Sequence, residues 1–74
     1  LPSASDIIDA FNFTTDFQFV DVSVINLGSG GTDTLELAAG ADSTFHGNVI
    51  VRATASALFR IVRLSNTIDI YRLA

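Results

Sequence analysis

The stretch FRIVRLSNTIDIYRLA, Phe59 to Ala74, decides the fold, because it has the pattern of two β-strands joined by a tight turn. Apolar and polar residues alternate in both halves, as they do in strands that bury one face. Phe59 and Ile61 fall on one face of the first strand and Arg60 on the other. Ser65-Asn66 supplies the small polar residues of a two-residue turn, and asparagine tolerates a positive φ. We therefore predict a β-hairpin that runs to the end of the chain.

Four shorter stretches upstream of the hairpin also have the pattern of strands. The longest is FQFVDVSVINL, residues 17–27, whose alternate valines (Val20, Val22, Val24) form a β-branched face that we expect in the core. Its other face is apolar at the ends and polar in the middle, so we expect the N-terminal helix or a neighbouring chain to cover it. The remaining strands are predicted at residues 33–38, 43–45 and 49–53.

Turn residues separate these strands about every eight to twelve residues, a spacing typical of antiparallel β-sandwiches and barrels. We therefore predict an all-β domain, an antiparallel β-sandwich or barrel-like fold of five to six short strands. The whole chain, residues 1–74, forms one domain in this interpretation, with the β domain over residues 17–74.

Residues 1–13 predict a short helical segment that leads into the β domain. Ser3 followed by Asp6 approximates a capping box, and an acid suits the positive end of a helix. Ile7, Ile8 and Phe11 form one apolar stripe, and Asn12 is expected to end the helix. So short a helix is marginal alone and must dock on the β domain.

The composition is strongly apolar for so small a domain, which indicates an unusually efficient core, a membrane segment, or apolar surface buried between subunits; we favour the last. Hydrophobic residues make up 49% of the 74 residues, and mean hydropathy is +0.46. A domain of this size buries only about 60% of its unfolded surface, and this chain has no cysteine to form disulfides. Its uncharged runs are shorter than the ~20 residues of a membrane-spanning helix. We therefore predict a homo-oligomer and no membrane insertion.

Charge is divided between the two halves of the chain. All acids except Asp69 lie in residues 1–42, which contain no base, and all four arginines lie in residues 43–74. Either strands from the two halves pair and their side chains meet, or the arginines form ion pairs between subunits. Net charge is −4, which disfavours nucleic-acid binding. The candidate interface residues are Phe17, Phe19, Phe59, Arg60, Arg63, Tyr71 and Arg72.

No pattern of catalytic residues stands out. The loop GSGGTD, residues 28–33, lacks the lysine and following helix of a phosphate-binding loop, and it echoes only one copy of a calcium-binding repeat. The acid pairs Asp16/Asp21 and Asp33/Glu36 are expected in solvated strands and loops rather than flanking a cleft. His46 is predicted in a surface turn, where it contacts solvent, a ligand or its own copies at a symmetry axis. We predict no enzyme activity, no cofactor and no metal site.

From Phe17 onward the sequence resembles a small C-terminal β domain of phage and large-DNA-virus structural proteins, including tail-fibre, capsid-surface and collagen-like proteins. The matching segments are FQFVDVSVIN, the glycine-rich loop, DTLELAAGAD, STFHGNVIVRA and ATASALFRIVRLSNTIDIYRL, and LPSASDIIDAF resembles the segment that often precedes the domain. The resemblance implies a trimer-forming or fibre-capping module located on the virion.

Under this resemblance the chain is expected to be the C-terminal part of a longer virion protein, and its function is oligomerisation and capping. The number of subunits, three, comes from the resemblance, since the residues alone indicate only that the protein is not a monomer. The alternative is a receptor- or glycan-binding tip domain, for which the exposed aromatic candidates are Phe45 and Tyr71.

Overall fold

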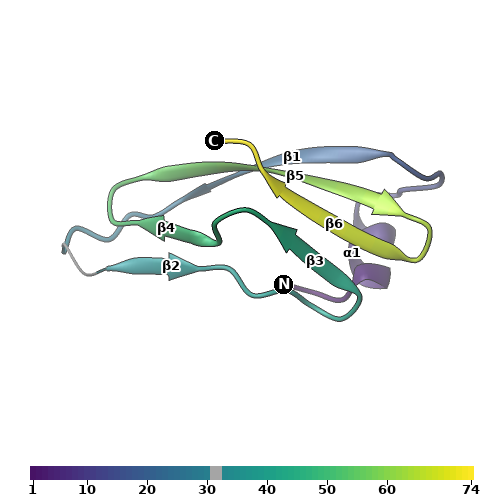
Figure 1. The fold of residues 1–74 in the computed structure, drawn as a ribbon, viewed down its shortest axis with the longest axis horizontal. Helices are drawn as coiled ribbons and strands as arrows, with labels where there is room; N and C mark the ends of the chain where they lie inside the picture. Colours follow the sequence, from purple (N-terminus) through teal and green to yellow (C-terminus); the bar gives the residue numbers. More distant parts are fainter. Residues whose placement is uncertain (31–32) are drawn as a thin grey trace.

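The computed structural model describes residues 1–30 and 33–74, which form two β-sheets and one short helix (Figure 1). The domain is elongated, with extents of 41 × 20 × 19 Å. Its elements are α1 (Ala4–Ala10), β1 (Phe19–Ile25), β2 (Thr34–Glu36), β3 (Ser43–His46), β4 (Ile50–Arg52), β5 (Ser56–Leu64) and β6 (Thr67–Arg72). The predicted small β domain with a short N-terminal helix is therefore confirmed.

The larger sheet has the strand order β1-β5-β6-β3, and β2 pairs with β4 in a second sheet. The sheets do not close into a barrel. All pairs are antiparallel except β3 and β6, which run parallel, so the prediction of a wholly antiparallel fold is wrong at this edge. β3 and β6 are not joined by a hairpin, since β4 and β5 lie between them in the chain, so no tight turn forces them to run antiparallel.

The predicted terminal hairpin is formed by β5 and β6, with Leu64 opposite Thr67 beside the two-residue turn. The positive φ of the turn is at Ser65 (57°) and not at Asn66, as in turns whose first central residue is left-handed. The backbone N–H of Ser65 donates to Asp16 Oδ1 at 2.9 Å, which ties the turn to the loop before β1. β5 begins at Ser56, earlier than the predicted Phe59.

β1 is shorter than the predicted 17–27 strand because its start is bulged. The N–H of Phe17 donates to the Arg63 carbonyl at 2.7 Å, and the N–H of Arg63 donates to the Gln18 carbonyl at 2.9 Å. Two residues of one strand thus face one residue of the other, which is the arrangement of a β-bulge. Phe17 has a φ of 67° and is 72% exposed.

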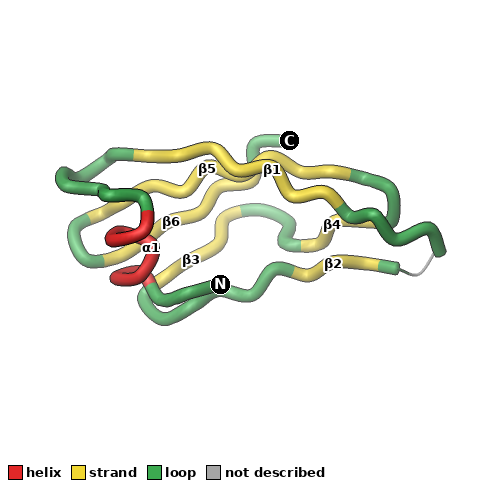
Figure 2. The backbone as a smooth tube through the Cα atoms, turned by 180° about the vertical axis from the view of Figure 1, so that it is seen from behind, coloured by secondary structure: helices red, strands yellow, loops and turns green. Residues whose placement is uncertain are grey.

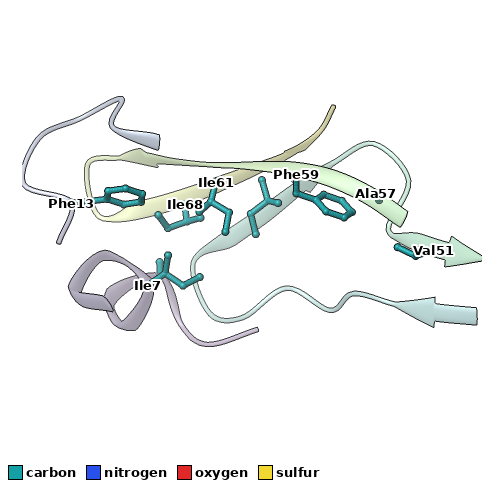
Figure 3. Close-up of a cluster of buried hydrophobic side chains, with 9 residues drawn as sticks. Ile7, Phe13, Val51, Ala57, Phe59, Ile61 and Ile68 are labelled. Carbon is teal, nitrogen blue, oxygen red and sulfur yellow. The ribbon is translucent and has the colours of Figure 1, made fainter. Parts of the chain in front are cut away.

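The core lies on one face of the larger sheet, which we call the inner face (Figure 3). Ile61 of β5 faces Ile70 of β6, as the alternation of the hairpin predicts. Val51 of β4 closes one end of the core, and Ile7 of α1 lies against the other (Figure 3). β4 and α1 lie toward opposite ends of the domain (Figure 2). The fully assembled core is Ala4, Ile7, Phe13, Val51, Ala57, Phe59, Ile61, Ile68 and Ile70.

The helix begins as predicted but docks through different residues. Ser3 is the N-cap, and its hydroxyl accepts from the N–H of Asp6 at 3.3 Å. The helix ends at Ala10, and Phe11 is 44% exposed rather than part of the buried stripe. Asn12 takes a φ of 55°, which turns the chain so that Phe13 enters the core instead. The rings of Phe11 and Phe13 stack with centroids 5.7 Å apart.

The first residues of the chain cross the segment between β2 and β3 at close range. The N-terminal amino group donates to the Ala38 carbonyl at 2.9 Å, and the N–H of Ala4 donates to the Ala41 carbonyl at 2.8 Å. Gly40 lies at the crossing, where a Cβ would lie 2.6 Å from the Leu1 carbonyl oxygen and overlap that of Pro2. Only a residue without a side chain fits there.

Gly40→Ala is therefore expected to destabilise the domain by about 1–3 kcal/mol, the usual cost of overpacking. Urea denaturation followed by circular dichroism measures this loss. Gly30→Ala is the matched control, because the added Cβ meets only the flexible side chain of Asp33 among its nearest neighbours. Equal losses in the two variants would contradict the crossing.

Candidate interaction surface

The face of the larger sheet opposite the core, the outer face, carries one residue from each strand in a transverse row. Asp21 of β1 pairs with Arg60 of β5, Arg60 with Tyr71 of β6, and Tyr71 with His46 of β3. We call these four residues the outer row. Asp21 lies in the first half of the chain, which contains no base, and Arg60 lies in the second half. The sheet therefore brings together opposite charges that are far apart in the sequence.

Arg60 and Asp21 form a bidentate ion pair within the chain. Arg60 Nε lies 2.8 Å from Asp21 Oδ1, and Arg60 Nη2 lies 3.0 Å from Asp21 Oδ2. This hydrogen bonding lowers the pKa of Asp21 and raises the pKa of Arg60. The guanidinium carbon is also 4.2 Å from the centroid of the Phe19 ring, a cation–π contact. The prediction that strands from the two halves pair and their charges meet is confirmed at this position.

His46 and Tyr71 form the other half of the outer row. Their rings stack with centroids 4.5 Å apart and an interplanar angle of 11°, and His46 Nε2 lies 3.4 Å from Asp69 Oδ1. The prediction of His46 in a turn is wrong, since it is the last residue of β3. Its parallel pairing with β6 places it beside Tyr71, and no local pattern in the sequence indicates that pairing.

Three of the predicted interface residues make their contacts within the chain: one is buried in the core, and two donate hydrogen bonds to backbone carbonyls. Phe59 is 2% exposed and belongs to the core, so its assignment to a surface is wrong. Arg63 donates to the carbonyls of Phe13 at 2.6 Å and Ser65 at 2.9 Å. Arg72 donates to the carbonyls of Ile50 at 2.7 Å, Asn48 at 3.1 Å and Ala74 at 3.2 Å. These arginines hold neighbouring segments together.

In the sheet formed by the described residues, β1 and β3 are the edge strands, and β1, with seven residues against four, is the longer. The N–H of Asn26 donates to the Ala55 carbonyl, and the N–H of Arg63 donates to the Gln18 carbonyl, so even-numbered residues bond to β5. Hydrogen-bonding direction alternates along an antiparallel strand. The odd-numbered residues therefore direct their N–H and C=O groups to the free edge; they are Phe19, Asp21, Ser23 and Ile25.

Both faces of β1 carry apolar side chains that the chain covers incompletely. On the outer face, Phe19 is 53% exposed and Ile25 is 62% exposed. On the inner face, Val20, Val22 and Val24 are half-buried, so the prediction that these valines lie in the core holds only in part. The sequence predicts the helix or a neighbouring chain on the face of β1 that carries Phe19. The helix instead packs against the core on the inner face, and Phe19 on the outer face stays exposed.

An apolar groove of about 280 Å³ runs between β1 and the N-terminal segment. Val22 lines it from the sheet, and Leu1 and Phe11 line it from the opposite side. A smaller apolar cavity of about 60 Å³ adjoins it and shares Leu1, Val22 and Ile61. The full lining of the groove is Leu1, Pro2, Asp6, Ile7, Ala10, Phe11, Val22 and Ile61.

The loops contain no second site among the described residues. In the GSGGTD loop, Asp33 Oδ2 accepts from the N–H of Gly30 at 2.9 Å, while Gly31 and Thr32 lie outside the described residues. No group of three or more histidine, cysteine or acidic residues with metal-binding geometry occurs in residues 1–30 and 33–74. Within the same ranges, no helix is long and apolar enough to cross a membrane.

No protein-family model, curated protein or solved structure matches this chain. Sequence reasoning identified Phe19, Arg60 and Tyr71, but it missed Ile25 and the groove residues Leu1 and Phe11. The exposed position of Ile25 on the same face as Phe19 was readable from the two-residue period of β1.

The Asp21–Arg60 pair makes stability depend on pH in a defined direction. Because the folded pKa of Asp21 is lowered, the pair contributes stability above the unfolded pKa of about 4 and loses it as pH falls through the folded value. Asp21→Asn should therefore lower the melting temperature slightly at pH 7 in low salt, with the difference vanishing in acid.

Melting curves across this pH range at two salt concentrations test the prediction, because an exposed pair is screened by salt. Asp9→Asn, which changes an exposed acid on α1, is the matched control. A difference for Asp21→Asn that persists unchanged in acid would show that the ion pair is not its cause.

Proposed function

We propose that this domain is a structural module through which copies of the chain associate, and that β1 carries the contact. The observation that supports this most strongly is the unpaired edge of β1 with incompletely covered apolar side chains on both faces. Long apolar edge strands template pairing with another chain, and monomeric proteins usually shorten, charge or cover them. On β1 the only charged residue is Asp21, and Arg60 already neutralises it.

The groove beside β1 supports the same function. A groove without charged residues other than Asp6, lined by Leu1, Phe11 and Val22, exposes apolar surface that a small domain gains stability by burying. A second copy placed against β1 would cover both the groove and the outer-face residues Phe19 and Ile25. Such a surface fits a permanent structural contact better than a polar ligand.

The resemblance to β domains of phage and large-DNA-virus proteins gives this association a biological setting. In that setting the domain joins and caps the subunits of a virion surface or fibre protein. The resemblance implies three subunits, but the open edge of β1 supports association without fixing that number. We propose no catalytic activity, and three of the four acids that sequence analysis singled out have structural partners. Asp16 accepts from the hairpin turn, Asp21 pairs with Arg60, and Asp33 accepts from the N–H of Gly30.

The second candidate function is glycan or receptor binding, and the outer row is the observation that favours it. Tyr71 and His46 form an aromatic stack, and Arg60 and Asp21 provide planar polar groups on the same face. The other aromatic candidate, Phe45, packs against the core instead. Probing a glycan array with wild-type chain and with Tyr71→Ala tests this candidate. Specific binding by a chain that stays monomeric would favour it over association.

Association is tested by measuring the mass of the wild-type chain in solution by analytical ultracentrifugation over a range of micromolar concentrations. We expect an oligomer and a melting temperature that rises with protein concentration, because association stabilises the folded chain by mass action. A monomer at all concentrations would overturn the proposed function.

The same measurement on two isoleucine variants locates the contact. Ile25→Ser removes an exposed apolar side chain from β1, and Ile50→Ser makes the identical change on β4 at the other sheet. We expect the dissociation constant of the oligomer to rise at least about tenfold for Ile25→Ser, the equivalent of about 1.4 kcal/mol, and to stay unchanged for Ile50→Ser. The reverse order would place the contact on β4.

A further inference from the structure

The sequence of β1, FVDVSVI, is nearly palindromic about Val22. Polar residues, Asp21 and Ser23, flank the centre on either side, and valines follow at 20 and 24. Large apolar residues, Phe19 and Ile25, end the strand. An antiparallel pair of identical strands related by a twofold axis places each residue opposite its mirror position, so a palindromic strand is complementary to itself.

We infer that two copies of the chain pair through their β1 edges, antiparallel about a twofold axis at Val22. This inference rests on the proposed function and specifies its contact. In this register Phe19 faces Ile25 of the second copy, and Asp21 faces Ser23 of the second copy. The two larger sheets become one continuous sheet with β1 at its centre.

The direction of the free hydrogen-bonding groups agrees with this register. The groups that point to the free edge belong to odd-numbered residues, as deduced from the bonds of Asn26 and Arg63. Pairing Phe19 with Ile25 and Asp21 with Ser23 joins odd-numbered residues to odd-numbered residues, so their N–H and C=O groups meet. Val22 then faces its own copy as a pair without mutual hydrogen bonds.

Charge and burial select this register over its neighbours. Shifting the pairing by one step toward the start of β1 sets Asp21 against Asp21 of the second copy, and like charges directly opposite are destabilising. Shifting it the other way sets Asp21 against Ile25 and leaves Phe19 beyond the partner strand. Only the register centred on Val22 sets Phe19 against Ile25, and it sets Asp21 against a neutral serine rather than against its own copy.

The inner face gains cover from the same pairing. Val22 lies at the axis and also lines the apolar groove, so the grooves of the two copies adjoin across the axis. Val20 of one copy packs beside Val24 of the other, which covers valines that are half-buried in a single copy. The number of subunits joined by this contact is two, which differs from the three that the family resemblance implies.

Disulfide trapping tests the register directly, because the chain contains no cysteine. In Val22→Cys the two Cα atoms would lie about 4.5 Å apart at the axis, a separation that a disulfide spans. In Val24→Cys the two copies of residue 24 would lie about 14 Å apart, too far to bridge. Mild oxidation should therefore give covalent dimers of Val22→Cys and little of Val24→Cys.

A mixture supplies the positive control for the second variant. Val20→Cys and Val24→Cys should each fail to cross-link alone but form a mixed disulfide when combined, since Val20 faces Val24 of the second copy. Loss of cross-linking of Val22→Cys in urea shows that folded association, and not collision, is measured. Circular dichroism of each variant verifies that it is folded.

The outcomes separate the two proposals. Efficient cross-linking of Val22→Cys together with the mixed disulfide supports the inference. An oligomer by ultracentrifugation in which Val24→Cys cross-links alone, or in which Val22→Cys does not, overturns the register while the proposed function stands. A trimeric mass likewise overturns the twofold contact, and a monomeric mass overturns both.

Discussion

The structure depends on β5, which pairs along its length with β1 on one side and β6 on the other. Its alternate side chains Phe59 and Ile61 supply the centre of the core, and Ile68 and Ile70 come from the strand that the two-residue turn places beside it. The chain has no cysteine to form a disulfide, and the helix found among residues 1–30 and 33–74 is only seven residues long. Removing one buried isoleucine or phenylalanine from such a core costs about 2–5 kcal/mol, a large fraction of the stability of a small domain.

Because the core lies on one face of the larger sheet, so small a chain has few residues left to cover the edges and the opposite face of that sheet. The helix α1 and the β2–β4 sheet lie toward opposite ends of the long axis (Figures 1 and 2), and β1 stays open along its free edge. The apolar surplus in the composition is found there, in Phe19, Ile25 and the groove beside Val22. The charged side chains of the outer face, by contrast, have partners within the chain: Asp21 pairs with Arg60, and Asp69 lies beside His46. The edge of β1 therefore offers more uncovered apolar surface to a second copy than the arginines do.

Local patterns predicted the elements whose signals lie within a few residues of one another. The hairpin, the cap at Ser3 and the alternating faces of β1 follow from side-chain period and turn chemistry, and the structure contains all of them. Predictions failed where a position depends on a distant segment. Phe11 belongs to the helical stripe but loses its place in the core to Phe13 after the turn at Asn12, and His46 joins Tyr71 only because β3 enters the sheet parallel to β6.

The sequence by itself determined that the chain forms short strands, which faces of those strands are apolar, and that β1 is nearly palindromic. These properties follow from residue type and spacing within each segment, so they can be predicted without knowing which segments pair. Tertiary structure decided that Phe59 is core and Phe19 is surface, although both lie on alternating strands of similar composition. It also decided that β1 is an edge, because strand order depends on which long-range pairings bury the most apolar surface together. Because the strand order leaves β1 at an edge, its self-complementary sequence is accessible to a second copy of the chain.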